Sequence, residues 1–284
     1  MGLSSLSSLS ALSSVMGGGG GSPAYDAAAQ SYFDVRDTYG PLTVQQKIDI
    51  SNRFAAGKAN GYWDKLNLYL PMAGGDNASA NLINAINPAQ ILTPHGGITY
   101  ANSITGDGAT GYVDSGISGN EKNFIAANLT GTAPTTTLKR VMGAGYTSRG
   151  THYSFSLDYY QYLGSATALV SRQNNVAVPI AATTVSNPAS YNIAATLISG
   201  ILTAYMDSTA PASSSPANIF SSMVGWNYYL LGNSSGYLGS LFAENLSPHT
   251  LKSAAIGSNF TTDDATNYLD DEAVFQAAKA LWGG

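Results

Sequence analysis

Two short glycine-containing patterns have the spacing of known chemical sites. Gly106 to Gly111 has the G-x-G-x-x-G spacing of a dinucleotide-binding loop, and Gly232 to Gly236 has the G-x-S-x-G spacing of a serine nucleophile elbow. Both sites need a helix directly after the loop, because a helix N-terminus receives the pyrophosphate and the elbow is a strand-to-helix turn. A strand-like pattern follows each run instead. We therefore predict two turns, the first of them a hairpin.

The titratable residues also argue against catalysis. Glycoside hydrolysis needs two carboxylates roughly 5–10 Å apart, and the acids of the central region show no local pair. The chain has no cysteine, and its three histidines are far apart in the sequence. Of these, His249 follows Ser247 and Pro248, a pair that could start a helix. We expect no catalytic residue, no metal site and no cofactor.

The composition narrows the possible partners. Charged residues make up 10% of the 284 residues, against about 25% in typical domains. Lysine and arginine number 12 against 17 acids, giving a net charge of −5 without a basic stripe. Because binding to nucleic acid depends on such a basic surface, we do not expect nucleic acid to be a partner. No apolar run approaches the ~20 residues that cross a bilayer, so we expect no membrane insertion.

Residues 1–22 form an uncharged segment of serine, leucine and glycine. Its apolar residues recur at every third position: Leu3, Leu6, Leu9, Leu12 and Val15. A period of three fits a 3₁₀-like or polyproline-like peptide lying in a groove, and fits neither a strand nor an α-helix. The alternative is a disordered tail. We interpret the segment as an anchor to a larger assembly.

Residues 23–62 have the pattern of two helices. The first is predicted to start at Ser22 and Pro23 and to stop at Gly40. The second begins with a capping box formed by Thr43 and Gln46, and glycines 57 and 61 are expected to end it. Acidic and basic residues alternate along both helices, which indicates a solvated face.

Residues 63–260 contain many short strand patterns separated by turn residues. Examples are Leu66–Leu70, residues 154–162, and the apolar runs 198–206 and 224–231, with a short helix expected at residues 78–86. Short strands at this spacing favour an antiparallel β-sandwich or jelly roll. The predicted fold class is therefore mainly β, with an N-terminal helical segment and a C-terminal helix.

Residues 261–284 are predicted to form that C-terminal helix. Tyr268, Phe275 and Trp282 recur at intervals of seven. Such a stripe packs either on the chain's own core or on a sister subunit. In the second case it would be the seam of a homo-oligomer, for which we expect a trimer.

The order of several motifs resembles structural proteins of tailed bacteriophages. The matching segments are Tyr25–Phe33, Lys58–Leu66, Ile104–Ser115, Ala204–Asp207 and Gly236–Phe242. In that family a helical opening and a G-x-W turn precede a concanavalin A-like (laminin G-like) jelly roll. The resemblance covers about residues 25–282, and it implies a virion protein with a lectin-like sandwich.

Three features depart from the family's pattern. Ala28 replaces the second aspartate of the helical opening, and Ser208 replaces the glycine after Asp207. The acidic E-x-D-x-x-E strand of the glucanase branch is absent. This speaks against hydrolase activity and against the calcium site found in some members.

The function we predict is that of a non-enzymatic virion component, a surface-displayed fibre or tail protein that attaches to host glycans. Residues 1–22 would bind other virion proteins. Tyrosines that could stack on sugar rings, or instead be half-buried strand residues, are Tyr153, Tyr159, Tyr160, Tyr228 and Tyr229. The alternatives are a capsid decoration protein or head fibre, a polysaccharide hydrolase, and a secreted adhesin.

Overall fold

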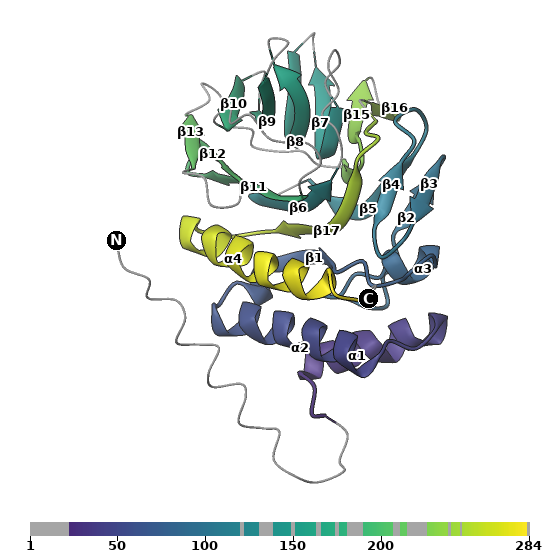
Figure 1. The fold of residues 1–284 in the computed structure, drawn as a ribbon. Helices are drawn as coiled ribbons and strands as arrows, with labels where there is room; N and C mark the ends of the chain where they lie inside the picture. Colours follow the sequence, from purple (N-terminus) through teal and green to yellow (C-terminus); the bar gives the residue numbers. More distant parts are fainter. Residues whose placement is uncertain are drawn as a thin grey trace.

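Three layers make up the molecule: a layer of helices, an eight-stranded sheet and a nine-stranded sheet (Figure 1). The computed structural model describes residues 23–119, 122–130, 139–148, 151–162, 166–173, 176–180, 190–206, 211–214, 226–237, 240–244 and 246–282. The two sheets pack face to face, and almost all their strand pairs are antiparallel. This confirms the predicted mainly β sandwich with helices before and after it.

The helices begin at residues that cap them through side chains. They are α1 (Ala27–Arg36), α2 (Val44–Ala59), α3 (Ala78–Asn81) and α4 (Thr262–Lys279), with 3₁₀ turns at Asp37–Tyr39 and Trp63–Lys65. The predicted capping box of Thr43 and Gln46 is confirmed, and Thr261 and Asp264 form a second one. The predicted start at Ser22 is wrong, because the carboxylate of Asp26 accepts the first free backbone N–H groups of α1.

The eight-stranded sheet lies in the middle of the molecule. Its order is β13 (Ala212–Ser214), β12 (Ile201–Met206), β11 (Ser190–Ile198), β6 (Phe124–Thr130), β17 (Thr250–Gly257), β4 (Ile104–Gly106) and β3 (Ile98–Tyr100), with β1 (Leu66–Leu70) also paired to β17. The apolar run 198–206 thus contains the last residue of β11, a turn and the whole of β12. Ser199 and Gly200, with φ of 48° and 80°, form the turn between the two strands.

The nine-stranded sheet forms the outer layer. Its order is β10 (Val176–Ile180), β9 (Ala166–Gln173), β8 (Thr151–Tyr162), β7 (Lys139–Ser148), β14 (Asn227–Leu230), β5 (Tyr112–Ser118) and β2 (Thr93–His95). Outside this order, β15 (Asn233–Tyr237) pairs with β7, and β16 (Ser240–Glu244) pairs with β15. The turn at Gly106–Gly111 joins β4 to β5 and therefore crosses between the sheets. The prediction of a hairpin there is wrong. The turn predicted at Gly232 to Gly236 is also wrong, because Asn233–Tyr237 form β15.

Two hydrophobic cores result from this layering. In β6, Ile125, Ala127 and Leu129 face the core between the sheets, while Phe124 and Ala126 face the core beneath the helices. A strand that is buried on both faces is apolar throughout, and the buried residues 124–129 of β6 follow this rule except at Asn128. The side chain of Asn128 is paired with that of Asn192 on β11 at 2.8 Å.

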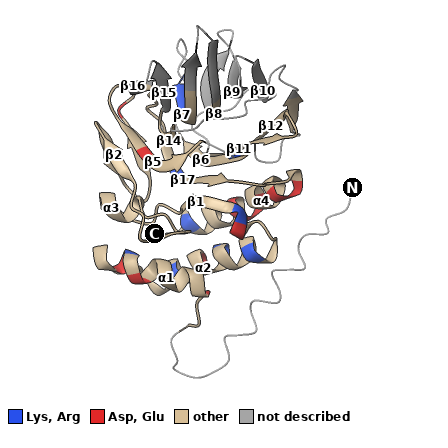
Figure 2. Cartoon of the chain, turned by 180° about the vertical axis from the view of Figure 1, so that it is seen from behind, with Lys and Arg blue, Asp and Glu red and all other residues tan. Residues whose placement is uncertain are grey.

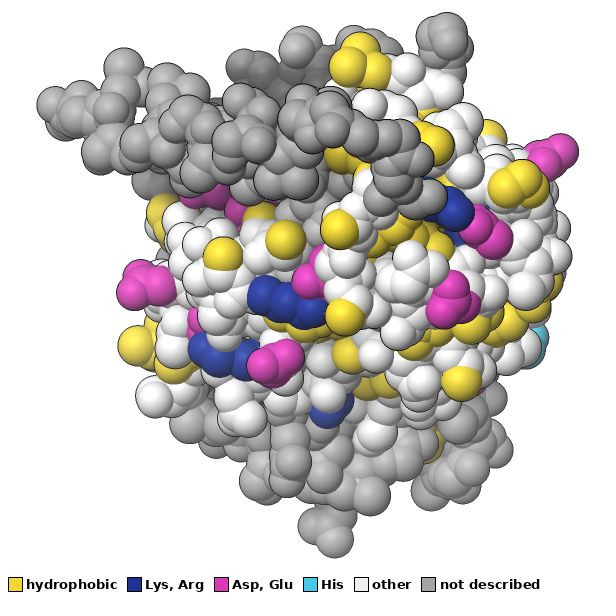
Figure 3. All heavy atoms as spheres, turned by 90° about the horizontal axis from the view of Figure 1, so that it is seen from below, with side chains coloured by type: hydrophobic (Ala, Val, Ile, Leu, Met, Phe, Trp, Pro, Cys, Tyr) yellow, Lys and Arg dark blue, Asp and Glu magenta, His cyan; other side chains and the backbone are white. Residues whose placement is uncertain are grey.

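Charged side chains are concentrated on the helices, whereas the described strands carry few (Figure 2). On the helical face, cationic and anionic side chains lie next to one another (Figure 3). Lys58 of α2 pairs with Asp26 at 2.7 Å, and Lys65 pairs with Asp264 at 2.6 Å. The predicted solvated face of segment 23–62 is thus confirmed for Asp26 and Lys58, but not for Arg36 and Arg53, which are 6% and 3% exposed.

The C-terminal aromatic residues pack inside their own chain. Tyr268 and Phe275 are 1% and 2% exposed, in the core beneath the helices. The half-buried indole of Trp282 contacts Phe275 edge-on and donates Nε1–H to Asp49 of α2 at 2.8 Å. This corrects the expectation of an oligomer seam, since side chains buried in this way are not available to a sister subunit.

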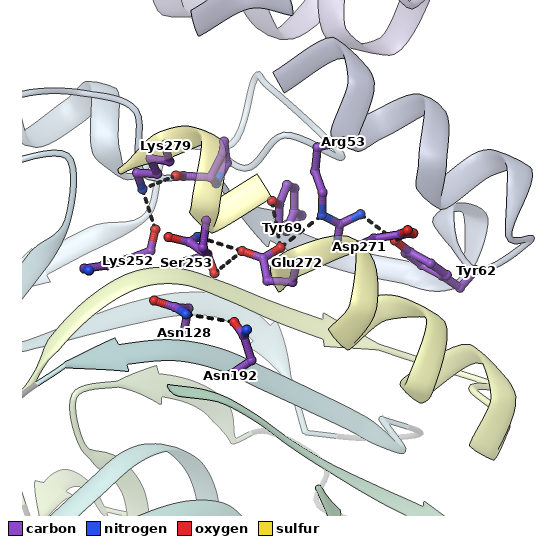
Figure 4. Close-up of polar contacts among 12 residues, drawn as sticks. Arg53, Tyr62, Tyr69, Asn128, Asn192, Lys252, Ser253, Asp271, Glu272 and Lys279 are labelled. Atoms are coloured by element: carbon purple, nitrogen blue, oxygen red, sulfur yellow. Dashed lines mark hydrogen bonds and ion pairs between the residues drawn. The ribbon is translucent and has the colours of Figure 1, made fainter. Parts of the chain in front are cut away.

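A buried ion pair connects the helical layer to the sheet (Figure 4). Arg53 of α2 donates to Glu272 of α4 at 3.0 Å, and both side chains are 1% exposed. The same carboxylate accepts from Tyr69 at 3.0 Å, from Ser253 at 2.5 Å and from Gln276 at 2.8 Å. Buried charges need partners of this kind, so this cluster fixes α2 and α4 over β1 and β17.

Candidate functional site

Three aromatic rings lie in a stack across neighbouring strands of the nine-stranded sheet. The rings of His95 on β2 and Tyr112 on β5 have centroids 4.5 Å apart at 12°. Those of Tyr112 and Tyr229 on β14 are 4.6 Å apart at 23°. The register explains the contact, because His95 is paired with Tyr112 and Tyr229 is paired with Asp114, two residues along β5. We call these three residues the aromatic row.

The aromatic row lies on the outer face of the sandwich. Val113, Tyr228 and Leu230 alternate with the row residues and are fully buried between the sheets. Successive strand residues point to opposite faces, so Tyr112 and Tyr229 point away from that core. Exposure decreases along the row, since His95 is exposed, Tyr112 is half-buried and Tyr229 is 6% exposed.

A carboxylate and an amide flank the row. Asp114 accepts a hydrogen bond from the Asn227 side chain at 3.0 Å and another from the backbone N–H of Gly116 at 2.8 Å. Burial, with smaller contributions from Asp114 and Tyr112, raises the pKa of Tyr229 to about 12. The Tyr229 hydroxyl therefore keeps its proton at neutral pH and can act as a donor.

This arrangement suits recognition of a polyhydroxylated ligand. Ring faces and edges of aromatic residues contact apolar C–H surfaces, and the polar ends of tyrosine and histidine exchange hydrogen bonds. The Asp114 carboxylate adds an acceptor that Asn227 and Gly116 already hold in place. Sites for small ligands typically combine aromatic surface with a small number of oriented polar groups.

The five tyrosines predicted to stack on sugar rings differ in where the structure places them. Tyr229 belongs to the aromatic row. Tyr228 is fully buried between the sheets, and burial raises its pKa well above the ordinary value, so its proposed role in stacking on a sugar is wrong. Tyr153, Tyr159 and Tyr160 lie in β8, but their side chains are outside the described part of the structure.

The predicted anchor also lies outside the described residues. It comprises Leu3, Leu6, Leu9, Leu12 and Val15.

The sequence reasoning missed two members of the row. Tyr112 and Asp114 alternate with Val113 and Ser115, a period of two that indicates one polar and one buried face of β5. His95 is far from Tyr112 in the sequence, and only the pairing of β2 with β5 brings the two rings together.

Other chemistry-bearing groups are structural. Ser247 and His249 form a hydrogen bond, but they are 0% and 1% exposed, and β17 begins directly after them instead of a helix. Asp107 accepts from three backbone N–H groups and the Thr110 hydroxyl, which closes the turn between β4 and β5.

Within the described ranges, no three potential metal ligands lie close together. No helix in these ranges is long and apolar enough to span a membrane.

Comparison with known proteins identifies the fold alone. No family model and no curated protein matches the chain. A mutant of Trypanosoma rangeli sialidase displaying trans-sialidase activity aligns with a TM-score of 0.52 at 12% identity, over 74% of this chain and 34% of that one. This chain thus spans about a third of the sialidase's length. A fold shared at this identity supports the β-sandwich and leaves function to the site.

Two further solved structures align less well. Domain 4 of AbnA, a GH43 extracellular arabinanase from Geobacillus stearothermophilus, in complex with arabinotriose, gives a TM-score of 0.49 at 12% identity, over 73% of this chain and 98% of that one. The full-length tailspike protein 2 from Escherichia coli O157:H7 bacteriophage CAB120 gives a TM-score of 0.40 at 14% identity, over 59% of this chain and 24% of that one.

Proposed function

We propose that the chain is a non-enzymatic virion component that attaches to host-surface glycans through the outer face of its β-sandwich. The observation that carries this proposal is the aromatic row of His95, Tyr112 and Tyr229, which becomes more exposed toward β2 and has Asp114 beside it. The composition, which is poor in charged residues and rich in hydroxyl groups, supports it, because such surfaces form adaptable hydrogen bonds.

The virion role rests on the motif resemblance to tailed-phage structural proteins. In this proposal residues 1–22 bind a neighbouring virion protein, and the sandwich is displayed outward. The eight-stranded sheet lies between the helical layer, which contains α1, and the nine-stranded sheet, which carries the aromatic row (Figure 1). Attachment without cleavage is the activity that we assign.

The test has two parts. The purified full-length protein is incubated with host-envelope glycans, and both retention and release of oligosaccharides are measured. Retention without release supports the proposal, whereas release of oligosaccharides identifies a hydrolase. Particles with and without the protein are then compared for adsorption to host cells. Unchanged adsorption together with fragile capsids would overturn glycan attachment in favour of a capsid-stabilising role.

A further inference from the structure

A cavity of about 210 Å³ lies at the C-terminal end of α4, on the opposite side of the eight-stranded sheet from the aromatic row. It is lined by residues of three elements that are distant in sequence. The polar and aromatic ones are Asn102, Ser103, Lys252, Gln276, Lys279 and Trp282. No step of the proposed glycan attachment uses them.

Lys279 brings a buried ammonium group to this cavity. The residue is 8% exposed, and Nζ donates to the backbone oxygens of Pro71 at 2.7 Å and Lys252 at 2.6 Å (Figure 4). An ammonium group has three N–H donors, so these two bonds leave one N–H without a hydrogen-bond acceptor in the described structure, and Nζ lies 5.9 Å from the centroid of the Trp282 ring. Burial lowers the pKa of Lys279 to about 7; the Glu272 carboxylate opposes this shift and the Lys252 ammonium adds to it.

Two more donors line the cavity, and within the described residues neither has an acceptor side chain. Lys252 is half-buried and belongs to none of the ion pairs of the described residues. Asn102 uses its Oδ1 to accept from the Gly75 N–H at 2.7 Å, which leaves its amide N–H₂ group as a donor.

The nearby carboxylates are already engaged. Glu272 accepts from Arg53, Tyr69, Ser253 and Gln276. Asp49 accepts from the indole N–H of Trp282 at 2.8 Å, which also fixes the ring at the cavity wall. The cavity therefore holds two ammonium groups and an amide donor beside a fixed aromatic ring, a combination that suits an anion attached to a ring or apolar body.

We propose that this cavity binds a small organic carboxylate of the size of one uronic acid. In this complex Lys252, Lys279 and the Asn102 amide hold the carboxylate, and the indole of Trp282 packs against the ligand's ring. The volume is below the roughly 300–1,000 Å³ of sites for drug-sized ligands, which limits the occupant to a single small ring.

Calorimetric titration of the full chain at pH 6.5 and low salt tests this proposal. Sodium glucuronate is the probe, and glucose and inorganic phosphate are the comparison ligands. We expect glucuronate to bind, glucose not to bind, and phosphate to bind at least about tenfold more weakly, a factor worth about 1.4 kcal/mol. Absence of glucuronate binding, or equal binding of glucose or phosphate, overturns the proposal.

Matched variants locate the site. Lys252→Gln, at a half-buried position where folding is expected to persist, should weaken glucuronate binding about tenfold. Lys122→Gln, which alters another half-buried lysine near the far end of β17, should not change it. Trp282→Leu should weaken glucuronate binding while leaving phosphate binding unchanged. Wild-type affinity in Lys252→Gln would overturn the assignment.

Discussion

Arg53 and Glu272 are 219 positions apart in the chain, yet their side chains form an ion pair with an Nε–Oε2 distance of 3.0 Å. Each of the two side chains is 1% exposed. Three tyrosine rings surround the guanidinium, with centroids 4.9–5.5 Å from its central carbon. Cation–π contacts of this kind add to the stability of a desolvated arginine. The pair therefore links the first and last helical segments through a solvent-excluded cluster.

Glu272→Gln is expected to lower the free energy of unfolding by about 3–5 kcal/mol, because it leaves Arg53 charged and buried without a counter-ion. Urea denaturation measures this change. The contrasting variant is Lys58→Met, which breaks the more exposed pair with Asp26 and should cost less than about 1 kcal/mol. Equal losses in the two variants would contradict the structural role of the buried pair.

Stability is expected to rise between pH 7 and pH 10. The pKa of Lys279 is about 7 in the folded chain and 10.5 ordinarily, so within this range the unfolded chain holds a proton that the folded chain lacks. The free energy of unfolding should then increase by up to about 1.4 kcal/mol per pH unit. Lys279→Met should abolish this slope in denaturation measurements made at several pH values. An unchanged slope would show that Lys279 is not the source of the pH dependence.

His95→Ala and Tyr112→Ala should each weaken glycan binding about 3- to 10-fold, as expected for loss of an aromatic contact worth about 0.5–1.5 kcal/mol. Tyr112→Phe keeps the ring and its stack, so its affinity separates the contribution of the hydroxyl from that of the ring. The control is Tyr39→Ala on the helical side. A loss of binding in the control equal to that in the row variants would place the glycan elsewhere.

Gly111→Ala is expected to destabilise the fold by about 1–3 kcal/mol through overpacking. A Cβ atom at this position would lie 2.3 Å from the backbone oxygen of Gly97, so the turn between the sheets would have to move. Thermal unfolding measures the loss. Thr99→Ala, at an exposed position of β3, is the control and should change stability by less than about 0.5 kcal/mol.

Local signals in the sequence predicted local structure well. The capping box of Thr43 and Gln46 and the strand Leu66–Leu70 depend on a few neighbouring residues, and both are present. The expected alternation of buried and polar positions in that strand is wrong, because Tyr69 is as buried as Leu68 and Leu70. Gly57 was expected to end α2, but it lies inside the helix, where a Cβ atom would come within 3.0 Å of the rings of Tyr62 and Trp63. Its role is close packing of the helix on the aromatic core.

Features that depend on pairing between distant segments could not be predicted. His95 meets Tyr112 through the register of β2 with β5, and Arg53 meets Glu272 through the packing of α2 on α4. The heptad of Tyr268 and Phe275 is visible in the sequence, but whether it faces its own core or another subunit depends on the sheet beneath it. The sequence pattern therefore predicted that the stripe is buried, but it did not predict the surface against which the stripe packs.

The two ends of the described chain both belong to the helical layer. Near the first end, Asp26 is tied to Lys58 of α2, and at the other end Trp282 is tied to Asp49 of the same helix. Tension applied between these ends would pass through α2 and its contacts with α4. The β-sandwich would lie outside this line of force, so its outer face could keep its shape while the helices carried the strain.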